Sequence, residues 1–373
     1  MFSIQSKSIL KSYAILVFLS TFIITGYLIH LHGHLGIFHF GDVHIESTST
    51  TSTSTTDHHH AEKTFISEMK RRIQNIDTVC KNTRHEIKSE TVYTSHLFWF
   101  PNHNIAYCPV LKAAHSTLMD YMIQVSNVTE KTLTMVKSKY HDPRDQILHL
   151  GAVHPTLNTW RTFVSNLPVP NNFTGVIIVR HPFERLVSAF RDKLERNNLP
   201  EPFYYDRFGK LIVQKYRKMA ISALGTQYFN KGNNFGTPIP VTDNRRPNSD
   251  LPSFWEFAQS VIDGFKIDEH WVPINKYCSI CSELTIRAFG YILKFEELDY
   301  EEKLFLIHSG WDRKIKMKYK LNVNDHHGLS GKDITKIYFS ILSNEQILSL
   351  YRVYELDFRL FEYSFTIADL QLP

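Results

Sequence analysis

The chain contains 373 residues with a formal net charge of +5, long enough for one large domain with additional segments. Hydrophobic residues account for 43% of the sequence and aromatic residues for 13%, enough to build a substantial core. The small positive charge is compatible with an anionic ligand but too weak to indicate a nucleic-acid-binding protein.

The first predicted element is a membrane anchor. The segment from Tyr13 to Leu31 contains no Asp, Glu, Lys or Arg, and its 19 residues approach the length needed to span a bilayer. Lys7 and Lys11 precede it, so residues 1–12 are expected to remain cytoplasmic. A cleaved signal peptide would have a shorter apolar region followed by a small-x-small site. We therefore predict an uncleaved transmembrane signal anchor in a single-pass type II membrane protein.

A lumenal stem is predicted after the anchor, over residues 32–95. Residues 47–56 are all Ser or Thr, and such a run cannot bury apolar surface. From residue 96 the pattern becomes globular, which predicts a catalytic domain over 96–373. The N-glycosylation sequons at Asn127 and Asn172 lie on the predicted lumenal side and agree with this topology.

Two strand–turn–helix units follow in the predicted domain. The first has a short apolar strand over 105–111 and a helix over 117–125. The second has a β-branched strand over 176–179, and Pro182 stands in the first turn of the amphipathic helix that follows it. Because this order is repeated, we predict an α/β fold with a parallel sheet flanked by helices. The chain beyond Ser253 is expected to be mainly helical.

Each predicted turn carries residues suited to an anion. Small residues let the backbone approach a ligand, and the N–H groups at a helix start attract negative charge. The first turn carries Lys112, Ala113, Ala114, His115, Ser116 and Thr117. In the second unit Arg180 follows the strand, where ligands of open α/β sheets bind. Ser188 could donate to the same group, whereas we interpret Arg185 as structural or supporting.

The four cysteines are compatible with an oxidising compartment. Cys278 and Cys281 form a CxxC, while Cys80 and Cys108 are too far apart to complete a zinc site. A redox-active CxxC would be expected between a strand and a helix. We therefore favour a structural disulfide between Cys278 and Cys281, with other pairings open.

Three blocks of the sequence are distinctive when taken together. The first is Tyr107 to Lys112, YCPVLK, and the second is Arg180 to Lys193, RHPFERLVSAFRDK. The third contains His270-Trp271, the CxxC and the FExL that begins at Phe295. In this order, over about residues 96 to 300, they resemble the Golgi carbohydrate sulfotransferases of the HNK-1 and chondroitin/dermatan 4-O-sulfotransferase type. The first block is similar to the 5′-phosphosulfate segment of that family, and the second to its 3′-phosphate-binding segment.

The resemblance implies a P-loop-like sulfotransferase fold and the donor 3′-phosphoadenosine 5′-phosphosulfate (PAPS). It implies that the turn from Lys112 to Thr117 holds the 5′-phosphosulfate, and that Arg180 and Ser188 hold the 3′-phosphate. It further implies a Golgi membrane enzyme acting on a glycosaminoglycan or glycoprotein glycan. The expected acceptor is the 4-hydroxyl of N-acetylgalactosamine in chondroitin or dermatan, with the 3-hydroxyl of a terminal glucuronic acid as the other candidate.

Sulfuryl transfer develops negative charge on the bridging oxygen of the departing nucleotide. A lysine ammonium stabilises this charge, which is the role assigned to Lys112. The acceptor hydroxyl requires a base, for which we select His154, positioned between the two donor motifs as in uronosyl 2-O-sulfotransferases. His115, in the phosphosulfate loop, is the alternative. No metal is required by this chemistry.

Three other functions share some of these sequence features. A lumenal glycosyltransferase would share the anchor and stem, but many use a DxD sequence, which this chain lacks. A nucleotide kinase is disfavoured because GxxxxGK[ST] is absent. A non-catalytic glycan-binding protein could keep the fold, although Lys112, Arg180 and Ser188 argue against it. No sequence feature indicates the oligomeric state.

Overall fold

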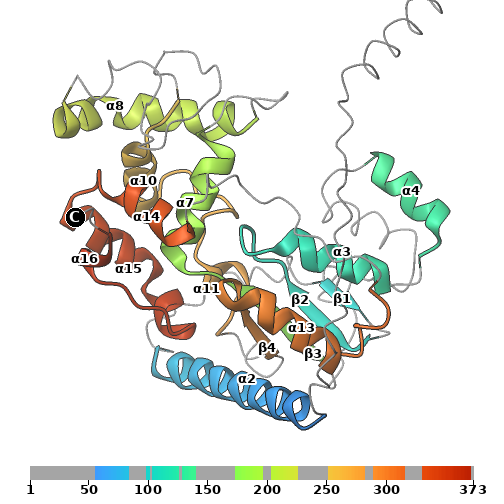
Figure 1. The fold of residues 1–373 in the computed structure, drawn as a ribbon. Helices are drawn as coiled ribbons and strands as arrows, with labels where there is room; N and C mark the ends of the chain where they lie inside the picture. Colours follow the sequence, from blue (N-terminus) through green and yellow to red (C-terminus); the bar gives the residue numbers. More distant parts are fainter. Residues whose placement is uncertain are drawn as a thin grey trace, which may run out of the picture. The chain divides into compact units, whose positions relative to one another are not determined.

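In the computed structural model, all the described residues belong to the unit that runs from Thr55 to Pro373 (Figure 1). The described residues are 55–83, 98–100, 103–125, 128–139, 173–195, 203–225, 251–281, 289–315 and 330–370. The predicted anchor over 13–31, His154, Asn127 and Asn172 lie outside these ranges. Within the ranges, none of the helices is both long enough and apolar enough to cross a bilayer.

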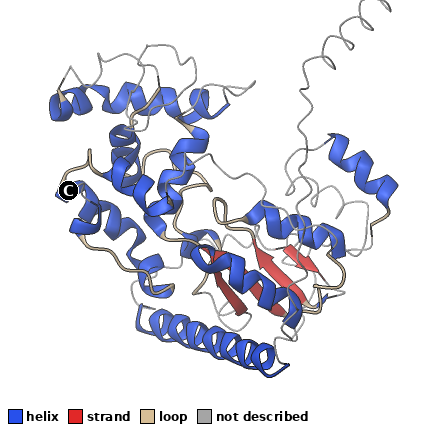
Figure 2. Cartoon of the chain, viewed as in Figure 1, coloured by secondary structure: helices blue, strands red, loops and turns tan. Residues whose placement is uncertain are grey.

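The described residues form a four-stranded sheet in the order β1–β2–β3–β4 (Figure 2). The strands are β1 (Phe98–Phe100), β2 (Ile105–Cys108), β3 (Thr174–Val179) and β4 (Phe289–Lys294). β2, β3 and β4 are parallel, which confirms the predicted parallel sheet. The edge strand β1 differs because it pairs with β2 in the antiparallel direction.

Strand β4 was not predicted, although it completes the sheet. It pairs with β3 from Gly175↔Phe289 to Val179↔Lys294, with a register shift near Val176. A Cβ atom on Gly290 would lie 2.2 Å from Cγ2 of Thr174. Glycine at this position therefore permits the close approach of the two strands.

Among the described residues, the helices before residue 226 are α2 (Thr55–Thr83), α3 (His115–Val125), α4 (Glu130–Lys139), α7 (Pro182–Lys193) and α8 (Lys210–Leu224). They are followed by α10 (Phe254–Ile262), α11 (Ile274–Tyr277), α13 (Leu298–His308), α14 (Gly331–Phe339), α15 (Asn344–Leu360) and α16 (Ile367–Leu370). Short π and 3-10 turns occur at η3 (Tyr205–Gly209) and η4 (Phe295–Glu297). Helix α7 begins at Pro182, as predicted.

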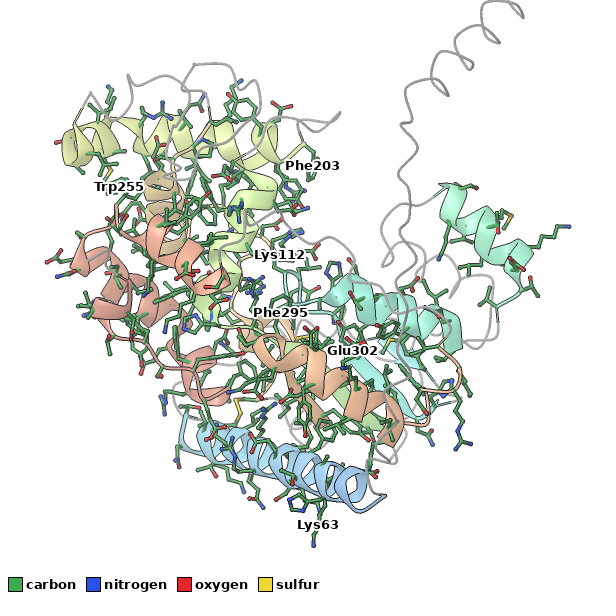
Figure 3. The ribbon with its side chains drawn as sticks, in the orientation of Figure 1. Lys63, Lys112, Phe203, Trp255, Phe295 and Glu302 are labelled. Atoms are coloured by element: carbon green, nitrogen blue, oxygen red, sulfur yellow. A yellow bond between two sulfur atoms is a disulfide. The ribbon has the colours of Figure 1, made fainter. Side chains whose placement is uncertain are left out.

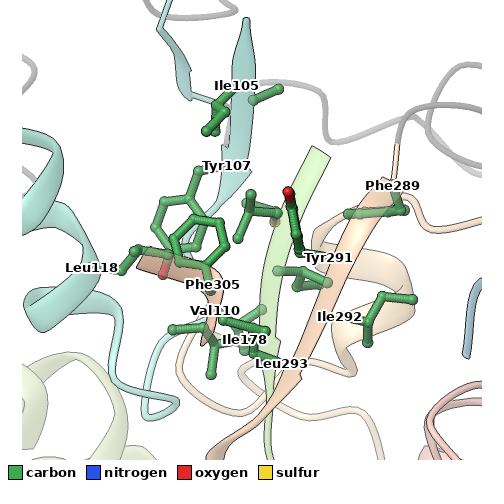
Figure 4. Close-up of a cluster of buried hydrophobic side chains, with 14 of the residues drawn as sticks. Ile105, Tyr107, Val110, Leu118, Ile178, Phe289, Tyr291, Ile292, Leu293 and Phe305 are labelled. Carbon is green, nitrogen blue, oxygen red and sulfur yellow. The ribbon is translucent and has the colours of Figure 1, made fainter. Parts of the chain in front are cut away.

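Two hydrophobic clusters hold these elements together. The first lies between the sheet and helices α2, α3 and α13, and Figure 4 shows part of it around Tyr107, Ile178 and Phe305. The second joins α7, α8, α10, α14 and α15, with Phe183 and Phe190 of α7 among its fully buried members. Because α7 continues directly from β3, it connects the sheet to the helical cluster.

Helix α2 belongs to the folded unit, although the stem was predicted to extend to residue 95. Phe65, Met69, Ile76 and Cys80 on one face of α2 are buried in the sheet cluster. Arg72 on the same face is 4% exposed; its guanidinium donates to the carbonyl oxygen of Ile292 in β4 (2.7 Å) and pairs with Glu301 of α13 (2.6 Å). The compact unit therefore begins about forty residues before the predicted boundary.

The predicted disulfide between Cys278 and Cys281 is wrong. Cys108, at the end of β2, is bonded to Cys278, and Cys80 of α2 is bonded to Cys281. The CxxC thus provides one sulfur to each of two bridges, across separations of 170 and 201 residues. These bridges fasten the segment after α11 to the sheet on one side and to α2 on the other.

Removing the Cys108–Cys278 bridge is expected to destabilise the protein substantially. A bridge that closes so long a loop restricts the unfolded chain, and its loss typically costs about 2–5 kcal/mol. Replacing Cys108 and Cys278 together by alanine should lower the urea midpoint of the full-length protein in detergent without abolishing the other bridge.

Peptide mapping without reduction provides the control for that experiment. Lys276 and Arg287 place both cysteines of the CxxC in one tryptic peptide. That peptide should be linked to the peptides that contain Cys80 and Cys108. An internally bridged peptide, free of both partners, would contradict the pairing seen here.

Candidate functional site

The site is built where the carboxyl ends of the parallel strands meet. After β2 the chain turns through residues 109–114 and enters α3 at His115, two residues earlier than predicted. Lys112 (φ 68°) and Ala114 (φ 53°) adopt left-handed backbone conformations. Residues with a Cβ rarely adopt this conformation, and it clusters at ligand-binding turns. The surrounding structure must therefore hold the turn in place.

Arg185 is the main support of this turn. Its side chain is 1% exposed and satisfied by three backbone carbonyl oxygens. Nε donates to Leu111 (2.9 Å), Nη1 to Val272 (2.8 Å) and Nη2 to Glu269 (3.2 Å). Burial lowers its pKa, opposed by nearby acidic groups. Arg185 thus ties the turn after β2 to the segment that precedes α11, which agrees with its interpretation as a structural residue.

Arg180 lies at the end of β3, and its guanidinium contacts the same turn. Nη1 donates to the carbonyl oxygen of Lys112 (3.1 Å), and Nη2 is 3.7 Å from a carboxylate oxygen of Glu184. The guanidinium carbon stands 4.3 Å from the centre of the Phe295 ring, at the end of β4. Nε is buried and has no hydrogen-bond partner among the described residues. Such an unsatisfied donor is costly unless a ligand accepts from it.

The amino group of Lys112 is held by an acidic partner on α7. Nζ lies 3.1 Å from Oδ2 of Asp192, and Nζ of Lys193 lies 3.0 Å from the same oxygen. Burial lowers the pKa of Lys112, whereas Asp192 raises it. Burial would raise the pKa of Asp192, but Lys112 and Lys193 together lower it. One carboxylate therefore faces two ammonium groups, which leaves excess positive charge beside the turn.

The other residues predicted for the donor site lie on the same elements. Ser116 and Thr117 are buried in the first turn of α3, Ala113 is buried in the preceding turn, and Ser188 is buried two turns into α7. His115 begins α3, with Nε2 3.4 Å from Oγ of Ser116. The structure thus brings both predicted halves of the donor site to one edge of the sheet. Figure 3 shows Lys112 and Phe295 there, in the centre of the view.

Some residues at this edge were missed by reasoning from the sequence. Asp192 was inside a recognised segment, but no role was assigned to it, and Glu184 was interpreted only as a salt-bridge partner within its helix. Gly331 opens α14, and a Cβ there would lie 2.6 Å from Oε2 of Glu184 and 3.4 Å from Nη2 of Arg180. No local motif marks Gly331, because its proximity arises only from the fold.

Comparison with known proteins agrees with this geometry. Residues 95–364 match the sulfotransferase family. The chain is 28% identical to mouse carbohydrate sulfotransferase 8 over 74% of its own length and 58% of that protein. It is 27% identical to chicken carbohydrate sulfotransferase 10 (77% of this chain, 71% of that protein). The rat carbohydrate sulfotransferase 11 is 26% identical (81% of this chain, 77% of that protein).

No solved structure matches the chain significantly. The chain spans little more than half the length of carbohydrate sulfotransferase 8, at 58%. The family match, however, includes both turns of the site and extends over most of the sequence. The chain therefore belongs to the sulfotransferase family.

Proposed function

We propose that this protein is a PAPS-dependent carbohydrate O-sulfotransferase. The observation that carries the proposal is the hydrogen bond from Arg180 to the carbonyl oxygen of Lys112. It joins the two turns whose sequences resemble the two donor-binding segments of carbohydrate sulfotransferases. If the two turns faced separate surfaces, they could not bind one donor that carries phosphate groups at the 3′ and 5′ positions of its ribose.

The residues present fit an anionic nucleotide donor. Lys112, Lys193 and Arg180 supply positive charge, and the N-terminus of α3 adds N–H donors. The buried Nε of Arg180 lacks an acceptor among the described residues, and a phosphate oxygen would satisfy it. We assign the turn from Lys112 to Thr117 to the 5′-phosphosulfate. Arg180 and Ser188 are assigned to the 3′-phosphate.

PAPS, when bound, supplies the sulfuryl group and a stable nucleotide leaving group. The ammonium of Lys112 is proposed to stabilise the charge that develops on the bridging oxygen. Asp192 orients that ammonium and opposes the effect of burial on its pKa. Arg185 fixes the backbone that carries Lys112. The chain thus contributes charge and positioning rather than covalent chemistry.

A lumenal, Golgi location is part of the proposal. All four cysteines are paired in disulfides, and such bonds persist in oxidising compartments such as the secretory pathway. The apolar segment 13–31 is proposed as the type II anchor. The names of the relatives refer to carbohydrate, which supports a glycan acceptor. We propose the 4-hydroxyl of N-acetylgalactosamine in chondroitin or dermatan as the sulfated position.

The test uses the full-length protein purified in detergent. It is incubated with [³⁵S]PAPS and a panel of desulfated glycans, followed by disaccharide analysis. Label is expected in 4-sulfated N-acetylgalactosamine disaccharides. Label at another sugar hydroxyl would contradict only the proposed acceptor position and would leave the proposed sulfotransferase activity intact. A protein that binds immobilised 3′-phosphoadenosine 5′-phosphate (PAP) without sulfating any glycan would support a non-catalytic binder, and failure to bind PAP would overturn the donor assignment.

A further inference from the structure

A histidine–carboxylate pair lies in the turn before α11, outside the residues assigned above. Nδ1 of His270 is 2.6 Å from Oδ1 of Asp268, and the backbone N–H of His270 donates to the same oxygen (3.0 Å). Both side chains are largely buried, at 10% and 14% exposed. The carboxylate thus fixes the orientation of the imidazole ring.

This contact also selects the tautomer of His270. At 2.6 Å from a carboxylate oxygen, Nδ1 must carry the proton and donate it. The hydroxyl of Tyr204 is 3.3 Å from the same nitrogen. Nε2 is then the nitrogen with the free lone pair, and within the described ranges no side chain or backbone group hydrogen-bonds it. An imidazole held in this manner is arranged to accept a proton at Nε2.

Arg185 places the pair beside the donor turn. Its guanidinium hydrogen-bonds the carbonyl oxygens of Leu111 and Glu269, which immediately precede Lys112 and His270 in the chain. One rigid, fully buried group therefore sets the positions of both backbones relative to each other.

A second connection runs through side chains. Lys112 and Lys193 share Asp192, and the Lys193 ammonium stands 4.8 Å from the centre of the Tyr204 ring. The Tyr204 ring in turn meets the His270 ring edge to face, with 5.4 Å between their centres. Lys112, which is predicted to stabilise the leaving group, and His270 are therefore connected through three side chains, those of Asp192, Lys193 and Tyr204.

The charges around the pair favour a neutral imidazole at neutral pH. Burial lowers the pKa of His270, and Lys193 lowers it further, while Asp268 and Glu269 raise it. For Asp268, the effect of burial is outweighed by His270 and, more weakly, by Arg207 of η3, so its pKa is lowered. The carboxylate therefore remains charged while the histidine can accept a proton.

We propose that His270, oriented by Asp268, is the general base that deprotonates the acceptor hydroxyl. This inference rests on the proposed sulfotransferase function. Nε2 takes the hydroxyl proton as the sugar oxygen forms its bond to sulfur. The bond between sulfur and the 5′-phosphate oxygen breaks, and its electron pair leaves on the nucleotide product beside Lys112. No further reactant is needed for balance.

Two other histidines, His115 and His154, were selected from the sequence for this role. His115, at the start of α3, has Nε2 3.4 Å from the hydroxyl of Ser116. His154 lies outside the described residues. His270 belongs to the third recognised block, but that resemblance gave it no role.

Kinetics of the full-length protein in detergent provide the first test. His270→Asn keeps a donor toward Asp268 but has no titratable nitrogen, and kcat should fall by about 10²-fold or more. PAP affinity should change less than about threefold, since transition-state deprotonation is lost rather than donor binding. The control is His308→Ala, because His308 is exposed on α13 and should retain normal kcat.

The pH profile distinguishes a base from a merely structural histidine. The active form is neutral, so kcat/KM falls on the acidic side as His270 becomes protonated. Asp268→Asn removes a group that raises the pKa of His270. The acidic limb should therefore move to lower pH, while the maximal rate falls because the ring is no longer oriented.

Chemical modification gives a readout that does not depend on turnover. Diethyl pyrocarbonate acylates neutral imidazole nitrogens, and peptide mass spectrometry reports each site. Modification of His270 should be slowed by the acceptor glycan, whereas that of His308 should not. Wild-type kcat in His270→Asn, or an acidic limb unmoved in Asp268→Asn, would overturn the assignment while leaving sulfotransfer intact. Absence of transfer by the wild-type protein would instead remove the proposed function.

Discussion

Replacing Lys112 by alanine is expected to lower kcat for sulfate transfer by about 10²- to 10³-fold, the usual effect of losing one preorganised charge at a developing anion. The ammonium is held by Asp192 and lies on a backbone fixed by Arg185. PAP affinity should fall much less, because the product retains its other contacts. Initial rates at saturating donor and acceptor, beside equilibrium PAP binding, measure the two effects separately.

The matched control is Lys63→Ala, an exposed lysine on α2 far along the chain from the site (Figure 3). Its kcat should equal that of the wild type. The alkaline limb gives a further check: burial already lowers the pKa of Lys112, and Asp192 opposes that shift. Asp192→Asn should therefore move the alkaline limb to lower pH. A wild-type kcat in the Lys112→Ala variant would show that Lys112 has no part in the mechanism.

The strand–turn–helix units were predictable because their signals are local. The β-branched run of β3 and the proline at the start of α7 act over a few residues, and both elements formed where expected. Strand β4 gave no such signal, because Gly290 interrupts a short apolar run, and the reason for glycine there is the close approach of Thr174 from the neighbouring strand. The antiparallel direction of β1 likewise depends on pairing rather than on propensity.

Helix α2 was obscured by its composition. It begins at the end of the Ser/Thr run and is rich in charged residues, so its average polarity suggested a stem. The spacing of Phe65, Met69, Ile76 and Cys80 nevertheless marks one face of a helix, and Arg72 on that face is buried only because Glu301 and a carbonyl oxygen satisfy it. The spacing of the apolar residues therefore predicts this helix better than its composition does.

The site was predictable as two turns but not as a network. Sequence motifs placed Lys112 and Arg180 at the ends of two strands, and parallel strands bring such ends together. The contacts of Asp192, Phe295 and Gly331 with these residues join distant parts of the chain. The predicted disulfide was wrong for the same reason, because Cys278 and Cys281 are close in the sequence but each is bonded to a distant cysteine.

Replacing Arg180 by lysine is expected to weaken PAP binding by about 10- to 100-fold, in line with the loss of one or two charge-assisted hydrogen bonds. Lysine keeps the positive charge beside Glu184 but loses the planar group that stacks on Phe295. It also loses the unpaired Nε, which is proposed to meet the 3′-phosphate. Isothermal titration with PAP, and with adenosine 5′-phosphate as the ligand that lacks only the 3′-phosphate, measures the effect.

The ligand pair isolates the 3′-phosphate from general damage to the site. Arg180 also donates to the carbonyl oxygen of Lys112, so a displaced turn would weaken both ligands alike. A direct contact with the 3′-phosphate predicts that Arg180→Lys weakens the binding of PAP far more than the binding of adenosine 5′-phosphate. Glu184→Gln should retain most of the preference for PAP, because it removes the partner of Arg180 but leaves the guanidinium against Phe295. If Arg180→Lys weakened the binding of both ligands equally, Arg180 would be a residue that supports the turn. Another cationic residue would then have to bind the 3′-phosphate.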